Sequence, residues 1–103
     1  MAMMQITIIP SPPEKEGGTS VSGYVARALE IIKDSGLKFE LTPTATVIEG
    51  KIEELFTLGR KIHNESFKHG AKRVVTLITI DDRRDKEIDM EYKKNSVLSK
   101  IKG

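Results

Sequence analysis

Cysteine and tryptophan are absent from this chain of 103 residues, and aromatic residues make up only 5% of it. Without cysteine the chain forms no disulfide scaffold, no thiolate zinc site and no cysteine nucleophile. Charge of one sign is not concentrated either, because 17 basic and 15 acidic residues are interspersed along the chain. The sequence therefore lacks the basic footprint that nucleic-acid-binding proteins usually carry.

Long hydrophobic runs are also missing. No stretch approaches the roughly 18 consecutive apolar residues of a membrane span, and the N-terminal segment MAMMQ has no basic region of the kind that opens a signal peptide. We therefore expect no membrane span, no signal peptide and a cytoplasmic protein. Charged residues form 31% of the chain while Asn and Gln are scarce, which favours a thermophilic source.

The residues that usually carry catalysis do not form a recognisable constellation. His63 and His69 are separated by six positions on a predicted helix, so they do not share a face. The neighbouring carboxylates of Glu53–Glu54 and of Asp81–Asp82 point apart, as adjacent side chains do. Ser22 stands in no G-x-S-x-G turn. We predict that the protein is not an enzyme and holds no metal.

The apolar pattern predicts one domain, residues 1–103, of the α+β class. Strands are expected at 4–9, 38–42, 45–49 and 73–81, and helices at 20–35, 51–69 and 87–101. The order β-α-β-β-α-β is that of the ferredoxin-like fold, here an antiparallel sheet with an added C-terminal helix.

Two burial patterns within this fold are specific enough to test. The strand at 73–81 is apolar on both faces, which predicts a central strand covered on both sides. The helix at 51–69 has a predicted core stripe, which comprises Ile52, Leu55, Phe56, Ile62 and Phe67. On the strands, the sheet face away from the helices is of mixed polarity, including Thr7, Ile9, Glu40 and Thr42. Such a face favours packing against another subunit.

Six residues are candidates for binding a ligand. Ser20 and Ser22 lie at a predicted helix N-terminus, where hydroxyls either cap the helix or bind an acceptor. On the short strand before the second helix, Thr46 offers a hydroxyl and Glu49 a carboxylate, although Glu49 could instead favour the helix dipole.

Tyr24 and Asp81 complete the set. Tyr24 is either a core residue or a stacking platform for an aromatic ligand. Asp81 opens the charged run Asp81–Asp85, which is either a solvated turn or a source of anionic contacts.

Several segments together resemble the small thiamine-binding protein family. They are SVSGYVA at 20–26, SGLKF at 35–39, PTATVIEG at 43–50, GAKRV at 70–74 and IDDRRD at 80–85. Each segment is short, but their order and spacing cover nearly the whole chain. The sequence departs from the family at Thr44-Ala45, where Met-Gly is more frequent.

The resemblance implies a ferredoxin-like fold, a homotetramer built from dimers, and non-catalytic binding of thiamine or its hydroxymethylpyrimidine moiety. No cofactor, nucleic acid or membrane partner is implied. In such a site, Glu49 would accept from the exocyclic amine of the pyrimidine, and Ser20, Ser22 and Thr46 would supply further hydrogen bonds. Tyr24 would stack on a ring or meet the thiazolium cation, and Asp81 would offer a second anion.

Alternative functions remain open. An oligomeric regulatory or assembly protein that binds another small ligand or anion at subunit interfaces would fit the same residues. An RNA-binding module would need aromatic residues on the open sheet face, and the strand at 73–81 has none.

Overall fold

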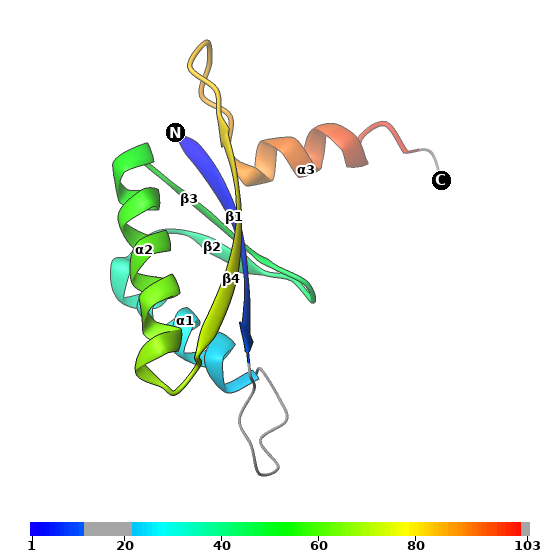
Figure 1. The fold of residues 1–103 in the computed structure, drawn as a ribbon. Coiled ribbons are helices and arrows are strands. Elements are labelled where there is room, and N and C mark those ends of the chain that lie inside the picture. Colours follow the sequence, from blue (N-terminus) through cyan, green and yellow to red (C-terminus); the bar gives the residue numbers. More distant parts are fainter. Residues whose placement is uncertain (12–21, 102–103) are drawn as a thin grey trace.

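The computed structural model describes residues 1–11 and 22–101. It contains four strands and three helices in these residues (Figure 1): β1 Ala2–Ser11, α1 Ser22–Ser35, β2 Phe39–Leu41, β3 Thr46–Gly50, α2 Ile52–Lys68, β4 Arg73–Asp82 and α3 Met90–Leu98. The strands form one antiparallel sheet in the order β2-β3-β1-β4. The predicted ferredoxin-like β-α-β-β-α-β order and the C-terminal helix are confirmed.

The core lies between the sheet and the helix pair α1 and α2, which cover the same face (Figure 1). Side chains alternate along each strand, so every second residue of β1 points into this layer. Met4 and Ile48, paired across β1 and β3, are fully buried there. The core cluster comprises Ala2, Met4, Ile6, Ala28, Ile32, Ile48, Leu55, Leu58 and Ile62.

Local signals explain where the helices begin and end. The N–H of Lys51 donates to Glu54 Oε1 at 2.9 Å, which closes the first turn of α2. Gly36 and Gly70 follow α1 and α2 with positive φ angles of 76° and 100°, the left-handed conformation in which glycine is favoured. None of the helices in the described residues has the length and apolar character needed to cross a bilayer.

The opposite side, which we call the open sheet face, is only partly covered. It consists of the alternate residues Met3, Gln5, Thr7, Ile9, Glu40, Val47, Glu49, Val75, Leu77, Thr79 and Asp81. Helix α3 projects from this side of the sheet (Figure 1). Only Met90 of α3 is buried, so most of this short helix is exposed.

The first strand is longer than predicted, because it continues through Pro10 to Ser11. β3 pairs with β1 only as far as Ile6, whereas β4 pairs with β1 along its whole length. Beyond Ile6 one side of β1 therefore has no neighbouring strand in the described residues. A proline is tolerated in a strand at such an edge, where its missing N–H removes no ladder bond.

Two predictions of burial were wrong. β4 is the last strand of the sheet rather than a central one, and its outer side chains are largely exposed. On α2, Leu55 and Ile62 of the predicted stripe are buried, but Phe56 and Phe67 are 58% and 44% exposed. The rest of the buried stripe consists of Leu58, Gly59 and Ser66. Both errors concern the same side of the molecule.

Candidate functional site

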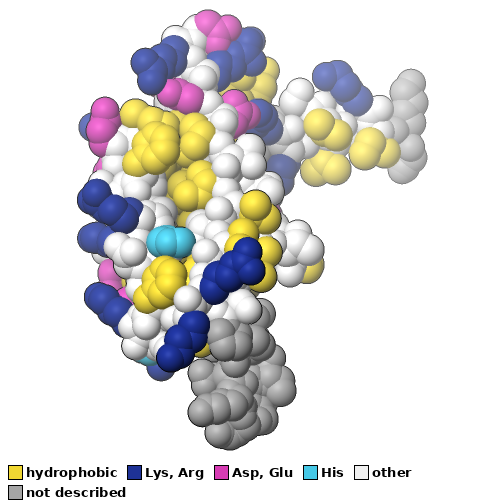
Figure 2. Space-filling model, viewed as in Figure 1, with side chains coloured by type: hydrophobic (Ala, Val, Ile, Leu, Met, Phe, Trp, Pro, Cys, Tyr) yellow, Lys and Arg dark blue, Asp and Glu magenta, His cyan; other side chains and the backbone are white. Residues whose placement is uncertain are grey.

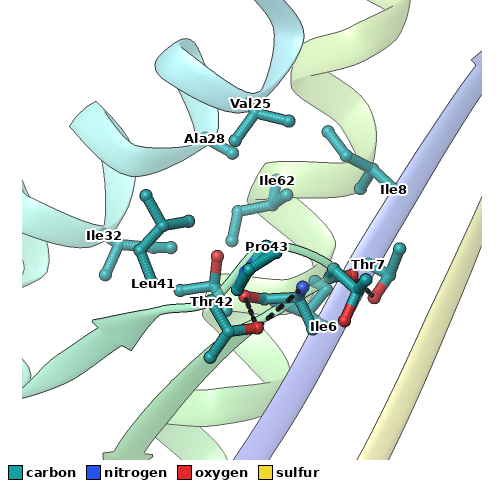
Figure 3. Close-up of a pocket in the computed structure, with 13 residues that line it drawn as sticks. Ile6, Thr7, Ile8, Val25, Ala28, Ile32, Leu41, Thr42, Pro43 and Ile62 are labelled. Atoms are coloured by element: carbon teal, nitrogen blue, oxygen red, sulfur yellow. Dashed lines mark hydrogen bonds between the residues drawn. The ribbon is translucent and has the colours of Figure 1, made fainter. Parts of the chain in front are cut away.

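A cavity of about 250 Å³ lies between α1, β1 and the connection from β2 to β3 (Figure 3). It is lined by Ile6, Thr7, Ile8, Val25, Ala28, Ile32, Leu41, Thr42, Pro43, Thr44, Ala45, Thr46 and Ile62. Apolar side chains supply most of this wall, and none of the described residues that line it is charged. An apolar cavity with a few hydroxyls suits an uncharged, flat ring better than an ion.

The connection that closes one side of this cavity is held in shape by its own hydrogen bonds. The Thr42 N–H donates to the Ala45 carbonyl at 2.8 Å. The Thr42 hydroxyl donates to the same carbonyl at 2.9 Å and accepts from the Ala45 N–H at 3.1 Å. Pro43 restricts the backbone between them. From β1, the Thr7 hydroxyl donates to the Thr44 carbonyl at 3.0 Å.

Of the predicted site residues that the structure describes, Thr46 alone lines this cavity. It is buried at the start of β3, and none of the hydrogen bonds between described residues uses its hydroxyl. Since no buried side-chain oxygen of the described residues lacks a partner, the unpaired Thr46 hydroxyl remains accessible, so a ligand in the cavity can reach it. Thr46, together with Thr44, whose carbonyl alone is bonded, therefore offers a hydroxyl that a ligand can engage without breaking a bond within the connection.

Glu49 lies at the other end of β3 and on the open sheet face, with only 7% of its side chain exposed. Its Oε2 accepts from the N–H of Met90, the first residue of α3, at 3.1 Å, and Lys38 Nζ lies 4.0 Å from the same oxygen. The carboxylate thus faces the N-terminus of α3 rather than that of α2. A negative charge is favoured at that end of a helix.

Asp81 lies on β4 opposite Met3, and Glu49 lies opposite Met3 from the other neighbouring strand. Lys93 of α3 donates to Asp81 Oδ2 at 2.5 Å. Lys94, also on α3, donates to Glu40 Oε1 at 3.2 Å. Carboxylates from β2, β3 and β4 therefore form a row that holds α3, and we call this row the acidic clasp.

Tyr24 is buried in α1, and its hydroxyl donates to the His69 carbonyl at 3.3 Å. In the described structure it ties α1 to the end of α2. Ser22 is the exposed first residue of α1, and Ser20 lies outside the described residues.

The predicted residues thus fall into separate places. Thr46 lines the cavity on the helix side of the sheet, whereas Glu49 and Asp81 belong to the acidic clasp on the open face. Sequence reasoning missed Thr7 and Thr42, whose hydroxyls shape the cavity. The threonine-rich segment TPTAT at 42–46 was a signal for Thr42, but nothing in the sequence pairs Thr7 with it.

The charged turn after β4 is paired within itself. Arg84 donates a hydrogen bond to Asp82 and holds the pKa of that carboxyl below its usual range, and Arg83 does the same for the pKa of Asp85. Across the described part of the chain, no group of three His, Cys, Asp or Glu side chains is placed to hold a metal ion.

Comparison with known proteins identifies the class to which this fold and cavity belong. A family model described as thiamine-binding protein matches residues 4–98. The chain therefore belongs to the thiamine-binding protein family, as its sequence motifs predicted.

Relatives from several organisms match nearly the full chain. The UPF0045 protein YqgV of Bacillus subtilis is 43% identical over 101 residues, which cover 94% of each chain. A UPF0045 protein of Methanothermobacter thermautotrophicus is 33% identical and covers 98% of this chain and 100% of its own.

Solved structures give the same result. The hypothetical protein MJ1052 of Methanocaldococcus jannaschii has a TM-score of 0.80 at 32% identity, covering 97% of both chains. The protein TM0486 of Thermotoga maritima, described as a candidate thiamine biosynthesis or salvage protein, has a TM-score of 0.77 at 26% identity and covers 93% of this chain and 97% of its own.

Proposed function

We propose that this protein binds thiamine or its hydroxymethylpyrimidine moiety without converting it, and that the pyrimidine occupies the cavity between α1 and the β2–β3 connection. The observation that carries this proposal is the Thr46 hydroxyl, which lines an otherwise mainly apolar cavity and has no hydrogen-bond partner among the described residues. Membership of the thiamine-binding family supports the choice of ligand. The likeness to TM0486, described with thiamine biosynthesis or salvage, supports it further.

The size and polarity of the cavity favour the pyrimidine half of the molecule. Its volume of about 250 Å³ is below the roughly 300–1,000 Å³ of common ligand pockets. A single ring fits such a space, while the thiazolium cation finds no charged partner among the described residues of the wall. The thiazolium and any phosphate therefore extend outside the cavity, and their contacts with the cavity wall add little to the binding affinity.

Thr44 and Ala45, where the family more often has Met-Gly, both line the cavity. The departure thus falls on the wall that would contact the ligand. At position 44, threonine is smaller than methionine, so it leaves more room in the cavity, and it adds a hydroxyl. We therefore expect this change to alter which pyrimidine derivatives the protein prefers.

We also propose that the protein is a homotetramer. Ile9, Val75 and Leu77 form an exposed apolar strip on the open sheet face, and α3 presents Val97 and Leu98 to solvent on the same side. Surfaces of this kind are typical of subunit contacts. Packing of two open sheet faces, separated by about 10 Å as in stacked sheets, would cover this strip.

Calorimetric titration with hydroxymethylpyrimidine, thiamine and thiamine diphosphate tests the ligand proposal. We expect the three to bind with similar affinity. Thr46→Val keeps the shape and removes the hydroxyl, so affinity should fall about three- to tenfold. Ala45→Leu should abolish binding by filling the cavity. Thr57→Val, an exposed position on α2, is the matched control and should bind normally.

Binding that needs the diphosphate, or that survives both cavity variants, would refute this assignment. Turnover is tested separately by chromatography of thiamine incubated with equimolar protein. Loss of thiamine in proportion to the protein would show that the protein is an enzyme after all.

A further inference from the structure

Among the described residues, β4 is an edge strand whose outer side no other strand of the sheet pairs with or shields. It pairs with β1 on one side, and no described strand pairs with the other. Seven consecutive residues at its centre, VVTLITI at 74–80, contain neither a charge nor a proline. Natural proteins shield long edges with lysine, proline, a bulge or another element, because unpaired backbone groups attract a further strand.

The helix beside this edge is apolar on the same side. Phe56 and Phe67 of α2 are largely exposed, and Ile78 of β4 is 40% exposed between them. Figure 2 shows hydrophobic side chains in a row along this side of the molecule, interrupted by a histidine. Edge and helix together form one continuous surface, which we call the β4–α2 edge.

Two contacts fix how α2 lies over β4. His63 Nδ1 is 2.7 Å from the Thr76 hydroxyl, and a Cβ on Gly59 would lie 3.1 Å from Ile78 Cδ1. The helix therefore runs antiparallel to the strand, with position 61 of α2 over position 77 of β4. The two aromatic side chains lie about equally far on either side of that centre.

We propose that β4 pairs antiparallel with β4 of a second copy of this chain, about a two-fold axis at Leu77, to form a continuous eight-stranded sheet. This pairing brings opposite charges together at both ends. Arg73 comes opposite Asp81 of the second copy, on the same face of the sheet, and Lys72 comes opposite Asp82 of the second copy.

The same axis places the two α2 helices side by side and antiparallel. Phe56 of one copy then comes next to Phe67 of the other, which buries both exposed rings. Aromatic residues in such positions are typical of interface cores. A second copy also explains the sequence of β4, because pairing on both edges turns it into the central strand that its apolar pattern predicts.

This inference rests on the proposed self-association and adds to it the surface and register. Because the chain has no cysteine, a single introduced thiol reports the register cleanly. Leu77→Cys places two thiols directly opposite each other, at a Cα separation of about 4.5–5.5 Å that a disulfide spans. Leu77 is 56% exposed, so the fold should tolerate the change.

We expect mild oxidation to convert Leu77→Cys almost entirely into covalent dimers. Val75→Cys is the control for register, because its two thiols would lie about 13 Å apart along the strands and should not cross-link. The double variant Val75→Cys/Thr79→Cys restores opposite pairs and should cross-link again. Equal cross-linking of Val75→Cys and Leu77→Cys, or none with Leu77→Cys, would overturn the proposed pairing.

A second measurement keeps the test independent of oxidation. Phe56→Glu puts a charge into the proposed contact of the two α2 helices and should weaken self-association at least about tenfold by sedimentation. Thr57→Glu adds the same charge at the next, outward-facing position and should leave it unchanged. If Phe56→Glu self-associates as strongly as the wild type, this interface is wrong, although the homotetramer proposal still stands. Titration of the same variants with thiamine tests the ligand proposal independently, because none of these substitutions lies in the cavity.

Discussion

Replacing Glu49 by alanine should release α3 from the sheet while leaving the rest of the fold in place. The carboxylate is nearly fully buried, and it accepts from the N–H of Met90 at the first position of α3. Helix N-termini leave such N–H groups without partners inside the helix. Removing Glu49 therefore leaves a buried donor unsatisfied and removes a negative charge from the favourable end of the helix dipole.

The size of the effect follows from the contacts that hold α3. A hydrogen bond to a charged group contributes about 1.5–3 kcal/mol, whereas exposed ion pairs contribute about 0–1 kcal/mol. The pairs Lys93–Asp81 and Lys94–Glu40 are both roughly half exposed. A loss of about 2 kcal/mol for Glu49→Ala corresponds to about 30-fold more frequent opening of α3, against at most about fivefold for Lys93→Ala.

Hydrogen exchange measured by mass spectrometry on peptides covering 88–98 reports this opening directly. We expect faster exchange in α3 with Glu49→Ala and unchanged exchange in α1 and α2. Glu49→Gln retains an acceptor for Met90 and should show an intermediate increase. Glu40→Ala serves as the control for loss of an exposed carboxylate from the same acidic clasp.

The same variants decide whether Glu49 also binds ligand, as the sequence motif predicts. If its carboxylate only holds α3, Glu49→Gln binds thiamine with unchanged affinity. A tenfold or larger loss of affinity with α3 still protected would refute our reasoning and assign Glu49 to the ligand. Unchanged exchange in Glu49→Ala would show that α3 is held by other contacts.

Three further predictions concern stability and charge. Leu55→Ala, at a fully buried core position, should lower the free energy of unfolding by about 2–5 kcal/mol in denaturant titrations; a loss below 1 kcal/mol would contradict its place in the core. Thr42→Val removes both hydroxyl bonds to Ala45 and should cost about 1–2 kcal/mol, with weaker ligand binding as the connection loosens. Arg84→Gln should raise the pKa of Asp82 back towards its usual range, since the Arg84 hydrogen bond lowers it; in NMR titrations the wild-type carboxylate stays paired to lower pH, and an unchanged midpoint would contradict the pairing.

The fold was predictable because its signals are local. Alternating apolar residues mark β1 and β3, and glycines stand where α1 and α2 end. The width of the buried stripe of α2 was less predictable, since Phe56 and Phe67 are as apolar as Leu58, which is buried in their place beside Leu55 and Ile62. Only the packing against β1 and β4 decides which of these residues face the sheet, and the helical pattern alone does not contain that information.

The site was predictable only in part, for a related reason. The motif PTATVIEG at 43–50 correctly marked a segment with unusual polar residues, but the sequence could not show which face each side chain occupies relative to α3. Glu49 was expected near the dipole of α2 or a ligand, whereas its hydrogen-bond partner is the N–H of Met90, 41 positions away in the sequence. Contacts over such separations depend on where a weakly amphipathic helix docks, and α3 carries almost no apolar stripe to predict it.

The course of β3 explains why these residues serve different structures. Side chains alternate along a strand, so Thr46 and Glu49, three positions apart, point to opposite faces of the sheet. A two-fold axis at Leu77, perpendicular to the sheet, keeps both cavities on the helix side and both acidic clasps on the open face. Stacking two open faces then brings Glu49 residues towards each other and leaves each Thr46 on the outside. A pyrimidine bound at Thr46 therefore reaches no Glu49, neither in the dimer paired through β4 nor in the tetramer with stacked open faces. Because of this separation, Glu49→Gln distinguishes a residue that holds α3 from one that binds the ligand.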